Sequence, residues 1–266
     1  MRKLLADSIQ GPFVLNVMTV PQVAAAGIEL LCARLNLAAR LDDPAFVVLS
    51  AVERAYVKSF RQHTDRISRA ATHTLLRHAL AARTGLPASA LDLQRDAMGR
   101  PFLRLPPTAM SVAPDFNVSH AGQYVLIAIA SGRRVGVDIE RHDRALDWQS
   151  LSPLVLTTDE RAQLASLPAP QQTAAFIQRW AIKEALLKAT GIGIGQGMNW
   201  FSVTDTADHT LAVHIHTALM PRQSQVLGLA GFTACRVDIT DTHYAACVAW
   251  SSTTPQPLVL AHSPAP

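Results

Sequence analysis

The chain has 266 residues and a formal net charge of +4, with 49% hydrophobic and 17% charged residues. This composition suits one large or two small globular domains and excludes a disordered chain. The sequence contains no apolar run of the roughly 18 residues that a membrane-spanning helix needs, so we expect no membrane segment. The three cysteines (Cys32, Cys235 and Cys247) are widely spaced and odd in number, which supports neither a disulfide framework nor a metal motif. We therefore expect a cytoplasmic protein.

The first 45 residues follow no pattern that predicts their structure. They form either a further strand and helix packed on the first half of the chain, or an extension for a specific partner.

Helical periodicity covers about residues 50–84 and 157–190. Each stretch opens with a Ser or Thr followed three residues later by a Glu, the capping box that satisfies free N–H groups at a helix start. Each also ends at a Thr-Gly pair, a typical helix stop. The capping pairs are Ser50 with Glu53 and Thr157 with Glu160. These parallels predict an internal duplication, with chance similarity between two helical sequences as the alternative.

The first helical stretch carries basic residues at helical spacing. Arg54, Lys58 and Arg61 recur at i, i+4 and i+7, and Arg69 continues roughly along the same side. Such a stripe either binds an anionic partner or is a solvated helix face, and the sequence leaves both interpretations open.

Three strands are expected between the helical stretches, at about residues 116–120, 124–130 and 135–140. The third reads Gly-Val-Asp-Ile-Glu at 136–140, and its alternation places Asp138 and Glu140 on one face. Like charges side by side repel unless something offsets them, and magnesium prefers oxygen ligands. The pattern therefore predicts a magnesium site or, equally well, a strand with a solvated acidic face.

The second helical stretch contains Trp-x-x-Lys-Glu-Ala-x-x-Lys at 180–188. At 100° per residue, Glu184 and Lys188 share a face, and Lys183 lies about a quarter turn away. The pair is either a surface ion pair or a third carboxylate with an ammonium group for phosphate oxygens. A glycine run at 191–197 follows the helix; it lacks the features of a P-loop and is expected to be a turn near the site.

Together, the acidic strand and the Trp-x-x-Lys-Glu helix resemble the signature of the 4′-phosphopantetheinyl transferase superfamily. Asn-Val-Ser-His at 117–120 and Gly-Arg-Pro at 99–101 resemble elements of its longer, monomeric branch, which activates surfactin synthetase. The resemblance covers about residues 50–205. It implies an α+β fold with two similar halves related by a pseudo-twofold axis and the active site in the cleft between them. We expect an N-terminal half at 1–133 (with the extension 1–45), a C-terminal half at 134–250 and a flexible tail at 251–266.

The resemblance also assigns roles to residues. Asp138, Glu140 and Glu184 resemble the family's magnesium ligands, and Glu184 its general base. Lys188 resembles the lysine that contacts the pyrophosphate and stabilises the leaving group. The candidate coenzyme A contacts are Arg54, Lys58, Arg69, Arg100, Ser119, His120, Lys183 and Lys188.

The implied reaction transfers the 4′-phosphopantetheine arm of coenzyme A to a serine of an apo acyl or peptidyl carrier protein and releases 3′,5′-ADP. The implied partners are coenzyme A and the carrier protein, and the chain is expected to be a monomer. One alternative is a coenzyme A or carrier-protein binding module that has lost catalysis. A second, a nucleic-acid binder, is disfavoured because aromatic residues make up only 6% and no RNA-binding or helix-turn-helix pattern is present.

Overall fold

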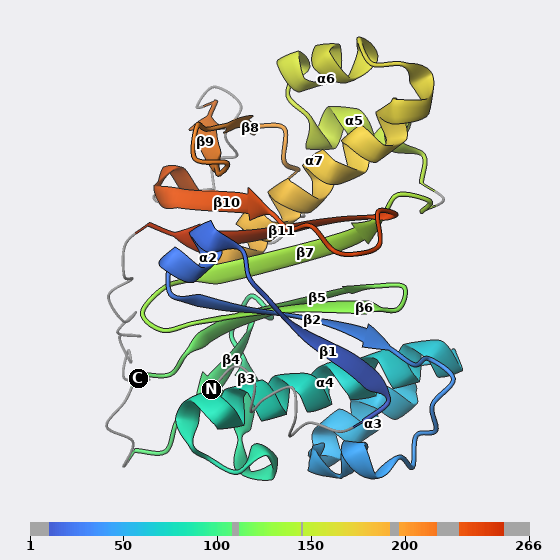
Figure 1. Cartoon of the computed structure of the whole chain (residues 1–266), viewed down its shortest axis with the longest axis vertical. Coiled ribbons are helices and arrows are strands. Elements are labelled where there is room, and N and C mark those ends of the chain that lie inside the picture. Colours follow the sequence, from blue (N-terminus) through green and yellow to red (C-terminus); the bar gives the residue numbers. More distant parts are fainter. Residues whose placement is uncertain (1–10, 108–111, 145, 192–196, 217–228, 253–266) are drawn as a thin grey trace, which may run out of the picture.

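The computed structural model describes residues 11–107, 112–144, 146–191, 197–216 and 229–252. Two antiparallel sheets pack face to face, and each is covered on its outer face by helices, so that the layers run helix, sheet, sheet, helix (Figure 1). The fold class is α+β, as predicted. Most of the glycine run and of the expected tail lie outside the described residues. Within those residues, no helix is long and apolar enough to cross a membrane.

The first sheet contains four strands in the order β1 (Phe13–Met18), β2 (Ile28–Leu35), β6 (Tyr124–Ala130) and β5 (Asp115–Ala121). The short helix α2 (Pro21–Ala25) joins β1 to β2, so part of the N-terminal extension is built into this sheet. Its outer face is covered by two consecutive helices, α3 (Ala51–Ser59) and α4 (His63–Thr84). A hairpin of β3 (Asp92–Arg95) and β4 (Pro101–Arg104) follows them.

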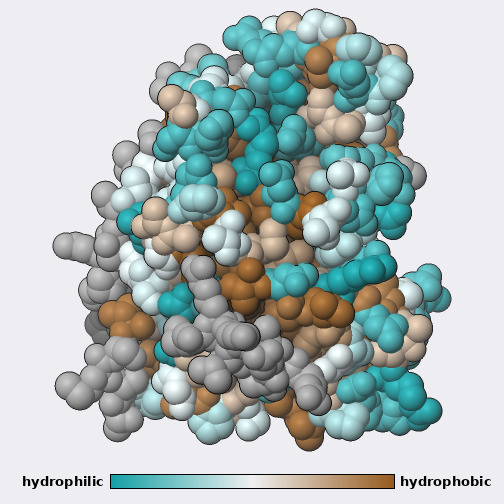
Figure 2. Space-filling model, in the orientation of Figure 1, coloured by the Kyte–Doolittle hydropathy of each residue, from teal (hydrophilic) through white to brown (hydrophobic). Residues whose placement is uncertain are grey.

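The second sheet contains five strands in the order β7 (Val135–Arg141), β11 (Tyr244–Ser251), β10 (Phe232–Arg236), β9 (Leu211–Ile215) and β8 (Phe201–Asp205). The long helix α7 (Ala169–Thr190) packs on its outer face, after the short helices α5 (Trp148–Val155) and α6 (Thr158–Ala165). Short 3-10 helices occur at Pro44–Val48, Ala88–Ala90 and Leu229–Gly231. In Figure 2, hydrophilic residues cover the end of the molecule formed by α5 and α6, and apolar residues gather at the level of the sheets.

Three apolar clusters hold the layers together. One lies between the first sheet and α4, one between the second sheet and α7, and one between the two sheets. Val137 and Ile139 belong to the central cluster, so the apolar face of β7 points toward the first sheet. Asp138 therefore points toward α7, as the alternation in the sequence predicts.

The predicted helix boundaries are confirmed by the local geometry. Both capping boxes are present, with the Ser50 and Thr157 side chains accepting hydrogen bonds from the N–H groups of Glu53 and Glu160. Each helical stretch is broken once, between α3 and α4 and between α6 and α7. Both long helices have 22 residues and end at a glycine with positive φ, which is +73° at Gly85 and +83° at Gly191. These parallels agree with the predicted duplication, whereas the pseudo-twofold axis and the domain boundaries remain predictions.

Candidate active site

A glycine lets the acidic strand approach the long helix. Gly136 faces α7, and a Cβ atom placed on it would overlap with the backbone of Ala185 and Ala189, lying 2.9 Å from the Cα atom of Ala189. A glycine inside a strand often marks such a close backbone contact. As a result Asp138, two residues further along the same face, lies directly beside the helix.

The same strand is also held to the first sheet by side chains. The carboxylate of Asp115, the amide of Asn117 and the hydroxyl of Ser119 accept hydrogen bonds from the backbone N–H groups of β7, at 2.7, 3.0 and 3.4 Å. Alternate residues of a strand share a face, so β5 presents all three acceptors to the edge of the second sheet. This side-chain ladder connects the edge strands of the two sheets and fixes the position of β7.

Lys188 and Asp138 form the centre of the cluster. The ammonium group of Lys188 lies 2.6 Å from Oδ1 of Asp138, and Ser119 donates its hydroxyl proton to the same oxygen at 2.8 Å. Burial raises the pKa of Asp138, while the charge and hydrogen bond of Lys188 act in the opposite direction. The structure thus brings together Ser119, Asp138 and Lys188, all of which the sequence predicts as site residues.

The other two acids complete the cluster. Burial and the charges of Asp138 and Glu140, opposed in part by the nearby Lys188, raise the pKa of Glu184 to about 7. Burial and the charge of Asp138 also raise the pKa of Glu140, which accepts a hydrogen bond from Arg144 at 2.8 Å. The cluster therefore contains three partly or fully buried carboxyl groups that repel one another. Two cations, Lys188 and Arg144, lie beside them.

The donor set fits a hard divalent cation. Oδ2 of Asp138 is buried and has no hydrogen-bond partner, so one carboxylate oxygen is left for another ligand. A cation would offset the mutual repulsion of the acids, and magnesium prefers carboxylate oxygens while keeping other positions for water and phosphate. In the part of the chain that the structure describes, no three His, Cys, Asp or Glu side chains already form a group able to hold a metal ion. Lys188 and Arg144 instead neutralise two of the acids.

A cavity of about 520 Å³ opens beside the cluster, between the two halves. Its wall includes Lys188 and Gly191 from the second half and Arg69 and His120 from the first. Burial, together with the charges of Arg69 and Lys188, lowers the pKa of His120 to about 4. His120 is therefore neutral near pH 7, while Arg69 and Lys188 supply positive charge.

A second cavity, of about 570 Å³, lies on the other side of His120. His120 lines both cavities, and the second one is also lined by Glu140, Arg141 and Arg144. The acidic cluster consequently has space on two sides.

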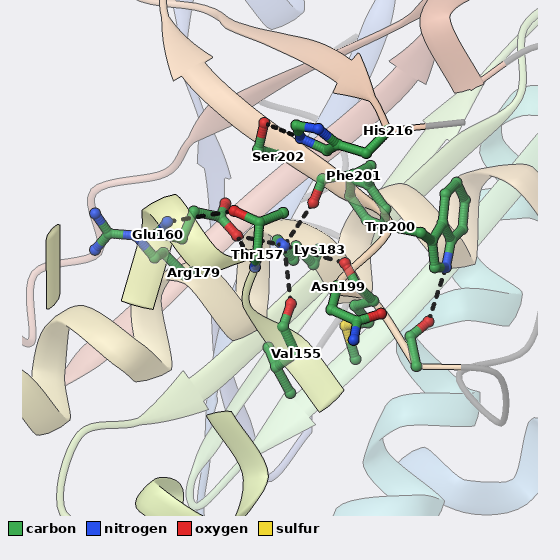
Figure 3. A network of polar contacts seen from close by, with 12 residues as sticks. Val155, Thr157, Glu160, Arg179, Lys183, Asn199, Trp200, Phe201, Ser202 and His216 are labelled. Carbon is green, nitrogen blue, oxygen red and sulfur yellow. Dashed lines mark hydrogen bonds and ion pairs between the residues drawn. The ribbon is translucent and has the colours of Figure 1, made fainter. Parts of the chain in front are cut away.

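Lys183 does not belong to the site, contrary to the sequence prediction. Its side chain is completely buried, and its ammonium group contacts Glu160 and three backbone carbonyl groups (Figure 3). Burial lowers the pKa of Lys183 to about 8, although Glu160 raises it. The helical spacing gives the correct angle between Lys183 and Glu184, but the fold places only Glu184 beside Lys188 and the other two acids.

The structure also corrects the predicted basic contacts. Arg54 and Lys58 point to the other side of α3, where they line a separate cavity together with Pro44 and Val47. Arg100 does lie in the wall of the first cavity, between the two halves. However, its guanidinium donates to Asp115 and to the backbone carbonyls of Val135 and Lys188, so it links β5, β7 and α7 rather than offering a free charge.

Four residues that build or position the site were not predicted as site residues from the sequence. Asp115 and Asn117 alternate with Ser119 on one strand, and this period of two is a readable signal. The glycine at position 136, inside a predicted strand, is a second readable signal. Arg144 gives no comparable signal, because its contact with Glu140 depends on the turn after β7.

Comparisons with known proteins show the family of the chain. Residues 134–248 match the 4′-phosphopantetheinyl transferase superfamily, and residues 43–132 match the N-terminal region of 4′-phosphopantetheinyl transferases. The chain is 30% identical over 172 residues to the 4′-phosphopantetheinyl transferase psf-1 of Bacillus pumilus, an alignment that covers 64% of this chain and 70% of that protein. It is 34% identical to a phosphopantetheinyl transferase of Thraustochytrium, covering 59% of this chain but only 57% of the relative.

Among solved structures, a holo-(acyl-carrier-protein) synthase of Bacillus anthracis in complex with coenzyme A (3′,5′-ADP) matches 44% of this chain and 93% of its own. The identity is 19% and the TM-score 0.34. The sequence matches are the stronger finding. The chain belongs to the 4′-phosphopantetheinyl transferase superfamily, and the matched regions are those of its longer type.

Proposed function

We propose that this chain transfers the 4′-phosphopantetheine arm of coenzyme A to a serine hydroxyl of an apo acyl or peptidyl carrier protein and releases 3′,5′-ADP. The observation that carries the proposal is the meeting of Asp138, Glu140, Glu184 and Lys188 beside a cavity between the two halves. Its family membership points to the same activity.

The first cavity, between the two halves, is the proposed site for the nucleotide end of coenzyme A. Its volume of about 520 Å³ lies in the range of ligand sites for small molecules and cofactors. Arg69 and Lys188 would face the phosphates, and neutral His120 would donate one hydrogen bond without adding charge. The pyrophosphate then comes to lie next to the acidic cluster.

Asp138, Glu140 and Glu184 are the proposed ligands of a magnesium ion. When bound, this ion supplies positive charge to the pyrophosphate oxygens, as metal ions do in phosphoryl transfer. Lys188, whose side chain is 30% exposed, could turn from Asp138 to contact the departing phosphate group.

The reaction forms one P–O bond and breaks another. The carrier serine oxygen attacks the β-phosphorus of coenzyme A, and the bond between that phosphorus and the oxygen bridging to the α-phosphate breaks. Glu184 accepts the serine proton, as a positioned carboxylate does in general base catalysis. The 3′,5′-ADP leaves with the charge that Lys188 stabilises.

Every residue of the cluster comes from this one chain, which supports action as a monomer. We propose a cytoplasmic location, where apo carrier proteins are made, with no nucleic-acid or membrane partner. Light scattering of the purified protein tests the monomer.

The test of the function is mass spectrometry of an apo carrier protein incubated with the chain, coenzyme A and magnesium. We expect the mass of one phosphopantetheine group to be added, and we expect EDTA and Glu184→Gln to abolish the addition. If no apo carrier gains mass while the chain still binds coenzyme A, the chain is the inactive binding module and the proposal fails.

A further inference from the structure

Lys183 occupies a site made for a buried ammonium group. Its side chain has no exposed surface, and its Nζ atom lies 2.6 Å from Oε2 of Glu160. Three backbone carbonyl oxygens, of Val155, Met198 and Phe201, accept from the same nitrogen at 2.8, 3.1 and 2.7 Å (Figure 3). A lysine ammonium has three protons and no acceptor, so four surrounding oxygens hold it from several directions at once.

These oxygens come from separate parts of the second half. Val155 ends α5, and Glu160 lies in the first turn of α6. Met198 lies just before β8, and Phe201 is its first residue. Lys183 therefore links α7 to both short helices before it and to the strand after it. Glu160 in turn accepts a hydrogen bond from the backbone N–H of Thr157 at 2.9 Å, so its own position is fixed by the capping box.

The direction of Lys183 fixes the direction of Glu184. The two residues are neighbours on α7 and project about 100° apart around its axis. If the helix turned about that axis, Lys183 would leave its oxygens and Glu184 and Lys188 would move away from Asp138. The contact of Gly136 with Ala185 and Ala189 sets how closely α7 approaches β7.

The first half contains the same arrangement of a buried cation and a capping-box acid, but without the carboxyl groups of the active-site cluster. Arg77 on α4 donates to Oε2 of Glu53 at 2.7 Å and to the carbonyl oxygens of Ala88 and Leu91, and Glu53 is the capping-box acid of the preceding helix. Arg77 precedes the C-terminal glycine of its helix by eight residues, just as Lys183 does. The next residue in α4 is His78 rather than an acid. A buried cation thus holds each long helix in place, Arg77 in α4 and Lys183 in α7. Only Lys183 is next in sequence to a proposed catalytic residue, Glu184.

We propose that Lys183 is a positioning residue: together with Glu160 it sets the rotation of α7 that brings Glu184 and Lys188 to Asp138. This inference rests on the proposed transferase function for the roles of Glu184 and Lys188. The rotation of α7 does not depend on the transferase function, so it can be tested separately.

The test compares Lys183→Met with Arg77→Met. Both variants remove the buried cation that seats a long helix, so both are expected to lower the free energy of unfolding. Lys183→Met is expected to lower kcat by about 10²-fold, the loss that a small misplacement of a catalytic group causes. Arg77→Met is expected to keep kcat near the wild-type value. Any effect of Arg77→Met should fall on KM for coenzyme A, because the partner of Arg77, Glu53, lines the first cavity.

Two further variants keep the test decisive. Lys183→Arg retains the positive charge and several donors, so we expect it to recover part of the lost kcat. Glu160→Gln retains an oxygen acceptor and loses the charge; it replaces Lys183→Met if that variant does not fold, with a smaller loss of kcat expected. Equal kcat for Lys183→Met and Arg77→Met, or wild-type kcat for a folded Lys183→Met variant, overturns the inference.

Amide hydrogen exchange of α7 provides a readout that needs no turnover. We expect Lys183→Met, but not Arg77→Met, to speed exchange around residues 183–188 in the folded protein. If the wild-type chain fails to modify any carrier while this contrast in exchange is seen, the proposed function fails and the positioning role holds. If exchange is equally slow in both variants, the positioning role fails whatever the activity.

Discussion

The ammonium group of Lys188 lies 2.6 Å from Oδ1 of Asp138, across the contact between α7 and the edge strand β7. Lys188 retains 30% of its side-chain exposure, whereas that of Asp138 is 3%. The lysine can therefore turn toward a ligand in the cavity, but the buried aspartate depends on whatever cation is beside it.

Replacing Asp138 with Asn should separate activity from stability. Asparagine keeps the shape but removes a buried carboxyl group whose pKa is raised, so we expect the free energy of unfolding to be unchanged or higher. The rate of carrier modification should fall by about 10²-fold or more, because a charge that supports the transition state is lost. Kinetic assays and urea unfolding check both parts. Asp143→Asn, an exposed acid near the end of the same strand, serves as the control, and equal activity of the two variants would contradict the assignment.

Replacing Gly136 with Ala should push α7 away from β7. The new methyl group has no room against the backbone of Ala185 and Ala189, and neither can move without the whole helix. We expect a loss of about 1–3 kcal/mol or more in the free energy of unfolding, measured in urea, as for other overpacked cores. Gly231→Ala is the matched control, since its nearest neighbour is the Ser252 hydroxyl at 3.3 Å. Equal unfolding midpoints for the two variants would show that the close contact is unimportant.

The basic residues of the first half should differ in their effects. Arg69 lines the cavity beside the acidic cluster, whereas Arg54 lines another one. Arg69→Ala should raise KM for coenzyme A by about tenfold, the effect of one lost hydrogen bond to a charged group, with little change in kcat. Arg54→Ala should leave KM for coenzyme A unchanged. The opposite result would place the coenzyme on the other side of α3 and restore the sequence prediction for Arg54.

Glu53 should make the stability depend on pH in the acid range. Burial raises its pKa, but hydrogen bonds from His73, Arg77 and the Ser50 backbone outweigh this and hold the pKa at about 2. A carboxyl group with a lowered pKa in the folded state stabilises the fold above its unfolded pKa of about 4.5. This stabilisation is lost as the pH falls toward 2, and it amounts to about 3 kcal/mol.

Urea unfolding of the wild type and of Glu53→Gln at several pH values tests this linkage. We expect the glutamine variant to lose less stability than the wild type between about pH 5 and pH 2. Asp159→Asn, an exposed acid on α6, is the control and should follow the wild type. Parallel curves for wild type and Glu53→Gln would mean that Glu53 is not held as an anion.

Local interactions explain what could be read from the sequence. Capping boxes and helix-ending glycines act within a few residues of themselves, so the starts of α3 and α6 and the ends of α4 and α7 were predictable. The alternation along β7 likewise predicted that Asp138 and Glu140 share the face opposite Val137. The N-terminal region gave no such signal because β2 is buried almost throughout, and a strand buried on both faces lacks alternation.

The sequence by itself determined the α+β class, the helix ends and the set Asp138, Glu140, Glu184 and Lys188, through periodicity and a resemblance to one superfamily. Only the tertiary structure decided which charged residues face the cavity. Lys183 and Glu184 are adjacent on one helix, and so are Glu53 and Arg54, yet in each pair the two side chains meet different surroundings. Helical spacing fixes the angle between neighbours, but the packing of the helix against its sheet fixes where each one points.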